Sequence, residues 1–167
     1  MSSTSISALE HAQVDAAVLL ASAIPTFELR NPTTAFLADT RTPSGARRAF
    51  GTDNFPALSL LADIDWLEQN ADAAQRLVRA MQKAMRWVRE QPVERVREMI
   101  PAESRMTPAE ADFRAIREAQ ASMSPDGMVP PGSAAAVERF VAVSDPRVRA
   151  AKVDAEKVYT NQFVRDR

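Results

Sequence analysis

The stretch from Trp66 to Gln91 constrains the fold most, because its apolar residues repeat with the period of an amphipathic helix. Asn70 is suited to cap the start of this helix, and Pro92 disfavours its continuation beyond Gln91. The sequence therefore predicts a helix of roughly 20 residues that covers one side of a small domain. Its apolar face contains Ala74, Leu77, Val78, Met81, Ala84, Met85 and Val88. Its opposite face contains Arg76, Arg79, Lys83 and Arg86.

Composition indicates a globular chain and excludes several chemistries. Of the 167 residues, 46% are hydrophobic, which is enough for a core, and the net charge is −1. This balance gives no electrostatic basis for a nucleic-acid partner, and the basic face of the long helix is best explained as a solvated face. The absence of cysteine excludes disulfides, thiolate metal sites and cysteine nucleophiles.

Neither a signal peptide nor a membrane span is predicted. The N-terminal residues 1–11 contain no basic region and no sustained apolar run. The longest uncharged apolar run, 16–24, is far too short to cross a bilayer. A chain produced as it stands is expected to stay in the cytoplasm.

The first third of the chain predicts strands. Residues 14–20 form a continuous apolar run that is typical of a buried strand in a parallel sheet, and residues 34–40 form a second strand candidate. Residues 57–64 are a third apolar segment, either a strand or the start of a helix. Residues 41–56 are rich in proline and glycine and predict a long connection. We therefore expect an α/β fold.

Helices punctuated by proline are predicted after Pro92. Thr107 and Glu110 form a capping box with Pro108 at the first helical position. The last predicted helix has Val158, Tyr159 and Phe163 as its buried side. The expected helices are 92–100, 108–122, 133–143 and 155–164.

The residues alone do not assemble a catalytic apparatus. His11 and Asp15 have the spacing of a pair on a helix, but no nucleophile with a motif accompanies them, and a surface histidine is the better interpretation. Asp63 and Asp65 are better explained as acidic residues at a helix start than as an acid–base pair. We expect no catalytic residues, no metal ligands, no cofactor and no enzymatic activity.

The order of several segments resembles one protein family. The run A-L-E-H-A-Q-V-D-A-A-V-L at 8–19 is similar to a segment of the substrate-binding proteins of ABC importers. The similarity is greatest to the nitrate/sulfonate/taurine type, which includes binders of thiamine precursors. It continues through F-L-A-D-T-R at 36–41, F-G-T-D-N-F-P-A-L-S-L-L-A at 50–62, 65–88, S-P-D-G at 124–127 and K-V-Y-T-N-Q-F-V at 157–164.

The resemblance implies part of a two-lobed α/β protein with a type II periplasmic-binding-protein fold. Residues 1–56 would end the second lobe, and residues 57–167 would return through the hinge and complete the first lobe with helices. The family has glycine where this chain has Ala12, and its members are roughly twice as long. The apolar face of the long helix would then lack part of its cover. We therefore expect a chain that is marginally stable, self-associating or part of a larger product.

Four residues are candidates for ligand binding. In open α/β sheets ligands lie beyond the carboxyl ends of the strands, which selects Ala21, Ser22 and Ala23 after the first predicted strand. Arg41, at the end of the second predicted strand, would supply charge to an anion. A turn serine and a surface arginine are the ordinary alternatives.

The resemblance implies a solute-binding component of an ABC import system, or a truncated piece of one. Its ligands would be small anions or heterocycles such as sulfonates, nitrate or pyrimidine precursors, its partners ABC permease subunits, and its location the periplasm. Two other functions stay open: a helical protein-interaction module, and an enzyme derived from the same fold. Partners would then include a second copy of the chain or a missing N-terminal lobe.

Overall fold

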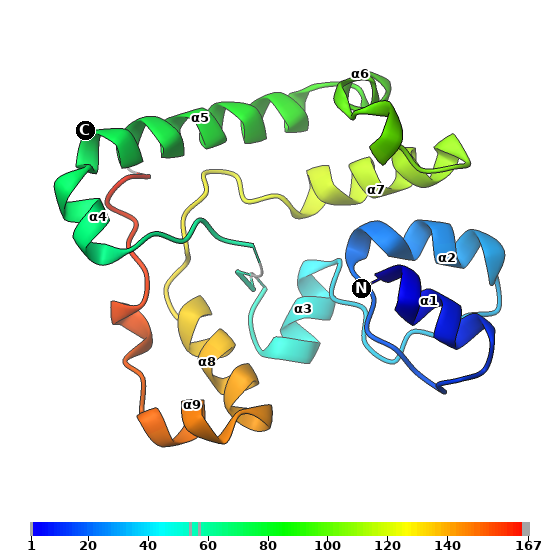
Figure 1. Ribbon diagram of the computed structural model, residues 1–167, viewed down its shortest axis with the longest axis horizontal. Helices are drawn as coiled ribbons and strands as arrows, with labels where there is room; N and C mark the ends of the chain where they lie inside the picture. The colour runs from blue at the N-terminus through cyan, green and yellow to red at the C-terminus, as the bar shows by residue number, and fades with distance from the viewer. Residues whose placement is uncertain (1, 54, 57, 165–167) are drawn as a thin grey trace. The chain divides into compact units, whose positions relative to one another are not determined.

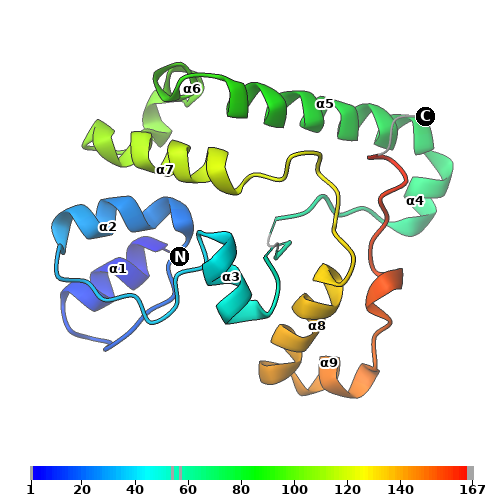
Figure 2. The same cartoon turned by 180° about the vertical axis from the view of Figure 1, so that it is seen from behind.

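The computed structural model describes residues 2–53, 55–56 and 58–164, and within these ranges the regular elements are helices (Figures 1 and 2). The chain divides into two compact units. Unit 1 comprises residues 1–37 and 88–121, and unit 2 comprises residues 38–87 and 122–167. The domain boundary expected at residue 56 concerns a complete two-lobed protein and stays a prediction.

The predicted α/β class is wrong for the described residues, which contain no β-strand. The predicted strands at 14–20 and 34–40 lie outside regular elements, and the segment that begins at Leu58 stays irregular up to Asp63. A strand forms only when a neighbour accepts and donates its ladder hydrogen bonds. No described segment provides that neighbour. The apolar runs therefore have the composition of strands but do not form a β-ladder.

Unit 1 is built from short helices around a small apolar core. Its elements are α1 (Ser2–Glu10), the 3-10 turn η1 (Ala21–Ala23), α2 (Ile24–Arg30), α6 (Val93–Met99), the 3-10 turn η2 (Ala102–Ser104) and α7 (Ala109–Ser122). The core residues come from α2, α6 and α7 and are Ile24, Pro25, Phe27, Val96, Ala111 and Ile116. Helix α7 begins and ends within one residue of its prediction.

A buried carboxylate ties three parts of unit 1 together. Asp112 on α7 is only 2% exposed. Its Oδ2 accepts a hydrogen bond of 2.7 Å from Arg97 Nε on α6, and both of its oxygens accept from the Met106 N–H at 3.1 Å. Because a buried charge without partners is costly, this set of contacts fixes α6 and the loop before α7 against α7.

Helix α1 ends in a Schellman motif whose central residue is Ala12. The N–H of Gln13 donates to the Ala8 carbonyl at 2.8 Å, and the N–H of Ala12 donates to the Leu9 carbonyl at 3.1 Å. Ala12 has a φ of 53°, in the left-handed region where a Cβ is unfavourable. This is the position at which the resembled family has glycine.

Unit 2 contains α3 (Pro43–Phe50), α4 (Ile64–Gln69), most of α5 (Ala71–Glu90), α8 (Ser133–Ser144), α9 (Pro146–Ala151) and the 3-10 turn η3 (Ala155–Lys157). The prediction of α5 is confirmed in length and end. Its start is also as predicted, directly after Asn70, but the Asn70 side chain serves α4 and donates from Nδ2 to the Trp66 carbonyl at 2.9 Å. Three rings cluster beside α8: Phe50 and Phe55 stack at 4.0 Å, and both meet Phe140 edge-on.

Helix α3 lies inside the region expected to be a connection. Thr42 caps it by accepting from the Gly45 N–H at 3.1 Å, Pro43 opens it, and Gly51 closes it at a φ of 74°. A Cβ at Gly45 would lie 1.8 Å from the Asp39 carbonyl oxygen, so only glycine fits there. The proline and glycine residues that suggested a loop are the start and stop signals of a short helix.

The predicted helix at 155–164 is wrong beyond its first turn. After η3 the chain continues without regular structure, and Val158 is exposed. Side-chain amides pair with the backbone here instead. Gln75 Nε2 donates to the Phe163 carbonyl at 2.8 Å, and the Asn161 amide exchanges two hydrogen bonds with the backbone of Val129. These bonds hold the C-terminal segment against α5 and the 122–132 connection in place of its own helical ladder.

We expect Asp112→Ala to lower the free energy of unfolding by about 3 kcal/mol, because it leaves the Arg97 guanidinium and the Met106 N–H without their acceptor. Arg117→Ala on the same helix is the control. It removes only an exposed ion pair with Glu110 and should cost less than about 0.5 kcal/mol. Urea unfolding followed by circular dichroism measures both losses, and equal losses would contradict the role given to Asp112.

Ala12→Gly should stabilise the chain by about 0.5–1 kcal/mol, because glycine adopts the left-handed conformation without the Cβ penalty. Ala8→Gly, inside α1, is the control and should destabilise it by about 1 kcal/mol. Urea unfolding midpoints of the two variants and the wild type measure these changes. A loss of stability in the Ala12 variant would argue against the Schellman geometry.

Candidate interaction surface

The predicted ligand-binding residues at 21–23 form η1 in unit 1. Ala21 and Ser22 are exposed and Ala23 is half-buried. The turn begins after Leu20, whose carbonyl accepts from the Ala23 N–H at 2.9 Å, and it leads directly into α2. Since the preceding segment is not a strand, these residues do not occupy the strand end that selected them. Ligand binding by them stays a prediction.

Arg41, the fourth predicted residue, lies in unit 2 and is already bound to a carboxylate. Its Nε and Nη2 donate to the two oxygens of Asp39 at 2.9 and 2.7 Å, and its backbone N–H donates to Asp39 Oδ1 at 3.1 Å. The hydrogen bonds from the Arg41 side chain hold the pKa of Asp39 below its ordinary value, against the opposing effect of burial. An incoming anion would therefore compete with Asp39 for this guanidinium.

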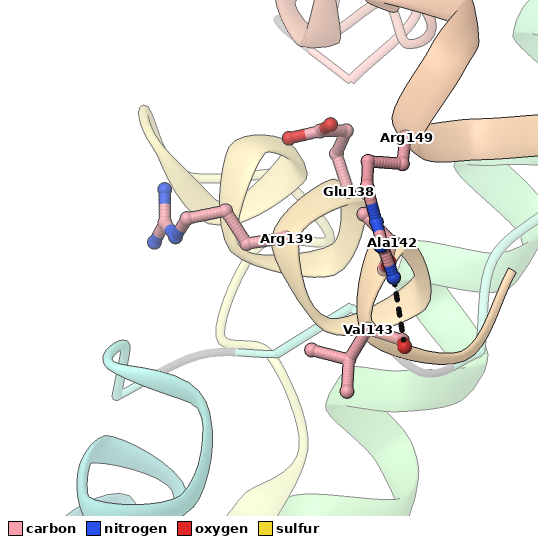
Figure 3. A pocket seen from close by; sticks show the side chains of 5 residues that line it. All are labelled: Glu138, Arg139, Ala142, Val143 and Arg149. Atoms are coloured by element: carbon pink, nitrogen blue, oxygen red, sulfur yellow. Dashed lines mark hydrogen bonds between the residues drawn. The ribbon is translucent and has the colours of Figure 1, made fainter. Parts of the chain in front are cut away.

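A hollow of about 410 Å³ lies between α8 and α9, and it is open to solvent (Figure 3). Glu138, Arg139, Ala142, Val143 and Arg149 line it. The Arg149 guanidinium donates to the carbonyls of Ala142 and Val143 at 3.0–3.2 Å. Its positive charge therefore stabilises the C-terminal end of the α8 dipole. The side chain of Arg139 also lines the hollow but extends away from those of Glu138 and Arg149 (Figure 3). The Arg149 side chain in this hollow thus caps α8, and the residues that line the hollow do not direct a set of free polar groups toward one point.

His11 and Asp63, for which the sequence predicts no catalytic role, each make only local hydrogen bonds. His11 lies directly after α1, and its Nδ1 is 2.8 Å from the Ser7 carbonyl in the last turn of that helix. Asp63 caps α4 by accepting from the N–H groups of Asp65 and Trp66. The described side chains contain no group of three or more metal-ligating residues, and no described helix is long and apolar enough to cross a membrane.

The most unusual feature of unit 1 is an exposed apolar segment at 14–20, between α1 and η1 (Figure 1). Val18 is 94% exposed, and Val14 and Leu20 are also exposed. Leu19 alone in this segment is half-buried. Scattered surface leucines and valines are normal, but a run of them outside any element is not.

Unit 2 carries a second exposed run, Leu58, Leu60, Leu61 and Ile64, which we call the apolar strip. Leu58 is 97% exposed and Leu61 is 93% exposed. The strip leads into α4 and α5 (Figure 1), where Trp66, Leu77 and Met81 are also substantially exposed. The apolar face of α5 is therefore only partly covered, although Ala74 on the same face is buried.

Comparison with known proteins gives a similar solved structure but no family. No protein-family model and no curated protein matches the chain. A solved structure from Bordetella bronchiseptica RB50 is similar, with a TM-score of 0.84 and 28% sequence identity. The alignment covers 96% of this chain and 50% of the Bordetella protein. The chain thus spans half the length of that protein and follows its backbone closely.

Asp39→Asn should destabilise the chain near neutral pH by about 1 kcal/mol, because it removes the charge from a two-pronged ion pair. The pKa of Asp39 is lowered in the folded chain, so its contribution is present above the unfolded pKa of about 3.9 and is lost as the pH falls through the folded pKa. The difference between wild type and variant should therefore shrink with acidification.

Urea unfolding at pH values of about 7, 4 and 2.5 measures this difference, because linkage ties each loss to one titration. Glu68→Gln on α4 is the control, since Glu68 is exposed and has no hydrogen bond in the described structure. A difference for Asp39→Asn that is constant with pH would contradict the ion-pair explanation.

Proposed function

We propose that this chain is a helical protein-interaction module that binds a second polypeptide through its exposed apolar segments. The apolar strip is the observation that carries this proposal, because two of its leucines are more than nine-tenths exposed. A monomer that works alone gains nothing from such a run, whereas an interface uses it as its buried centre.

Magnitudes support an interface larger than the strip. Full burial of one leucine or isoleucine side chain contributes about 1.5–3 kcal/mol. Association costs about 4–15 kcal/mol in lost translational and rotational freedom. The four residues of the strip would together contribute about 6–12 kcal/mol, which is of the same size as that cost. Stable binding would therefore also use the exposed side chains on α4 and α5, Trp66, Leu77 and Met81.

The comparison suggests the kind of partner. This chain corresponds to half of the Bordetella protein, and in that protein the remaining half is additional polypeptide. We therefore propose that the natural partner is a polypeptide equivalent to that remaining half, whether it is encoded separately or in continuity with this sequence. The interaction module would then be one part of a protein assembled from two pieces.

The other functions have less support. An enzyme would need a nucleophile, acid or base in a shared site, and the described titratable groups form local caps and ion pairs instead. Solute binding, expected from the family resemblance, would need polar groups that converge in a cleft. Arg41 and Arg149 are both engaged by the chain itself. Solute binding stays a prediction that calorimetric titration with sulfonates, nitrate and pyrimidines would test.

Leu61→Asp should weaken binding of the partner by about tenfold or more, because it places a charge in the buried centre of the interface. The probe is the part of the Bordetella protein that this chain does not cover, produced as a separate polypeptide. Sedimentation velocity of the mixture reports the complex directly.

Val158→Asp is the matched control, because Val158 is an exposed apolar residue of unit 2 outside the strip. It should leave binding unchanged. Wild-type chain that stays monomeric and does not bind the probe would contradict the proposal, and so would equal losses in the two variants.

A further inference from the structure

We infer that the partner presents an acidic amphipathic helix, which docks along the exposed side of α5 between Leu77 and Trp87. This inference rests on the proposed function and names the chemistry of the partner at one part of its surface. Two features of α5 carry it, an apolar stripe that the chain leaves uncovered and a row of unpaired cations beside that stripe. Both lie within unit 2.

The first feature is the apolar stripe on α5. Its members follow the three- and four-residue spacing of one helix face, and each of them is exposed. Leu77 is 50% exposed and Met81 is 42% exposed, whereas Ala74, farther around the same helix, is buried. An uncovered apolar stripe on a long helix is a surface to which a second helix can dock. We call this set the helix stripe, and it comprises Leu77, Ala80, Met81, Ala84 and Trp87.

The sizes of these side chains suit contact with a helix. Ala80 and Ala84 lie one turn apart and form a row of small side chains. Leu77 and Met81 form a row of large side chains on one side of it, and Trp87 stands on the other side. The ridge of a second helix packs between such rows, and small residues at the contact let the two axes approach closely. A bilayer is instead bound by large apolar side chains that enter it, which alanines do not provide.

The second feature is a row of cations along one edge of the helix stripe, which we call the basic row. It comprises Arg76, Arg79, Lys83 and Arg86. All four are exposed, and within the described structure none forms an ion pair or a side-chain hydrogen bond. Elsewhere in the chain, Arg41, Arg97 and Arg147 each bind a carboxylate. The basic row is therefore available to the carboxylates of a partner.

The basic row and the helix stripe are neighbours on the helix surface. Successive residues of an α-helix are turned by about 100°, so Arg76 and Lys83 come next after Ala80 and Trp87 around the helix. The sequence alone favours a solvated face for these cations. The structure adds that the apolar residues beside them lack cover, so that one docked helix would meet both sets at once.

The charge at this edge selects an acidic partner. A helix that covers the helix stripe brings its own flanking residues beside the basic row, where glutamates form ion pairs and lysines are repelled. In an antiparallel pair of α5 helices the two basic rows would lie on the same side and repel each other. In a parallel pair each row would meet the covered side of the other helix. A second copy of this chain is therefore a poorer occupant.

Three synthetic peptides of roughly 20 residues are the probes, and each has leucines at the a and d positions of its heptads or the same composition scrambled. The acidic peptide has glutamate at the flanking e and g positions, the basic peptide has lysine there, and the third peptide is the acidic one in scrambled order. We expect the full-length chain to bind only the acidic peptide. Its affinity should fall as the salt concentration rises, because salt screens the ion pairs.

Charge reversal in the basic row is the sharp test. Arg76→Glu combined with Lys83→Glu should weaken binding of the acidic peptide by about tenfold or more and permit binding of the basic peptide. Arg139→Glu combined with Lys152→Glu is the matched control. It makes the same change in net charge at two exposed cations of unit 2 that form no ion pair among the described residues, and binding should be unchanged.

Titration calorimetry gives the affinities of the wild type and of both double variants for each peptide. Circular dichroism and thermal unfolding check that the variants retain the wild-type fold. Binding of the scrambled peptide, or equal losses in the two double variants, would indicate attraction by charge alone and overturn the inference. Vesicles of phosphatidylglycerol that bind through the basic row, without binding of the acidic peptide, would assign this surface to lipid and overturn it as well.

The outcomes also separate this inference from the proposed function. No binding of the acidic peptide would overturn the inference in every case. The interaction module would still stand if the polypeptide from the Bordetella protein binds and Leu61→Asp weakens that binding. It would fall as well if neither probe binds. Self-association of the wild type that the reversal in the basic row abolishes would assign the helix stripe to a second copy and overturn the acidic partner.

Discussion

The pairing of backbone N–H and carbonyl groups is the constraint on which this structure depends. Helices satisfy these groups internally, so α5, α7 and α8 form wherever the pattern and the caps allow. An extended segment needs a neighbour to do the same. In the described residues such neighbours are absent, and the apolar runs at 14–20 and 58–62 stay irregular. The described fold is all-helical because helices are where the chain can pair its backbone N–H and carbonyl groups, even though its first third has the composition of strands.

Side-chain amides provide the missing partners at several places. Gln120 Nε2 donates to the carbonyls of Val88 and Gln91 at 2.7 and 2.9 Å, where α5 ends. Gln75, Gln82 and Asn161 do the same for the C-terminal segment of unit 2. Each bond contributes about 0.5–1.5 kcal/mol and also sets the path of a segment without regular structure. Among the described residues, no side-chain amide bonds to the backbone of the two exposed apolar runs. An external polypeptide is therefore proposed to cover them.

Charge has a local role in this chain. Asp112 with Arg97, Asp39 with Arg41, and Arg149 on the end of α8 each use a charged group to fix a neighbouring backbone or helix. None leaves a converging set of free polar groups in the described structure, which is why ligand binding has less support than protein binding. The described surface is instead marked by apolar side chains that lack cover, and burial of such side chains is the dominant driving force of association.

The sequence by itself determined the elements whose signals are local. The period of the apolar residues and Pro92 located α5, and the Thr-Pro-Ala-Glu pattern at 107–110 located α7 to within one residue, because the signals of a helix lie within a few residues of its ends. It also contains the start and stop signals of α3, Thr42, Pro43 and Gly51, although the proline and glycine content of 41–56 predicts a connection. Arg41 binds Asp39, which is only two residues away, so this pairing is local as well. Only the tertiary structure decided whether 14–20 and 34–40 become strands and whether 158–164 is helical. Those outcomes depend on partners far apart in sequence, and an apolar run does not specify whether its partner belongs to the same chain.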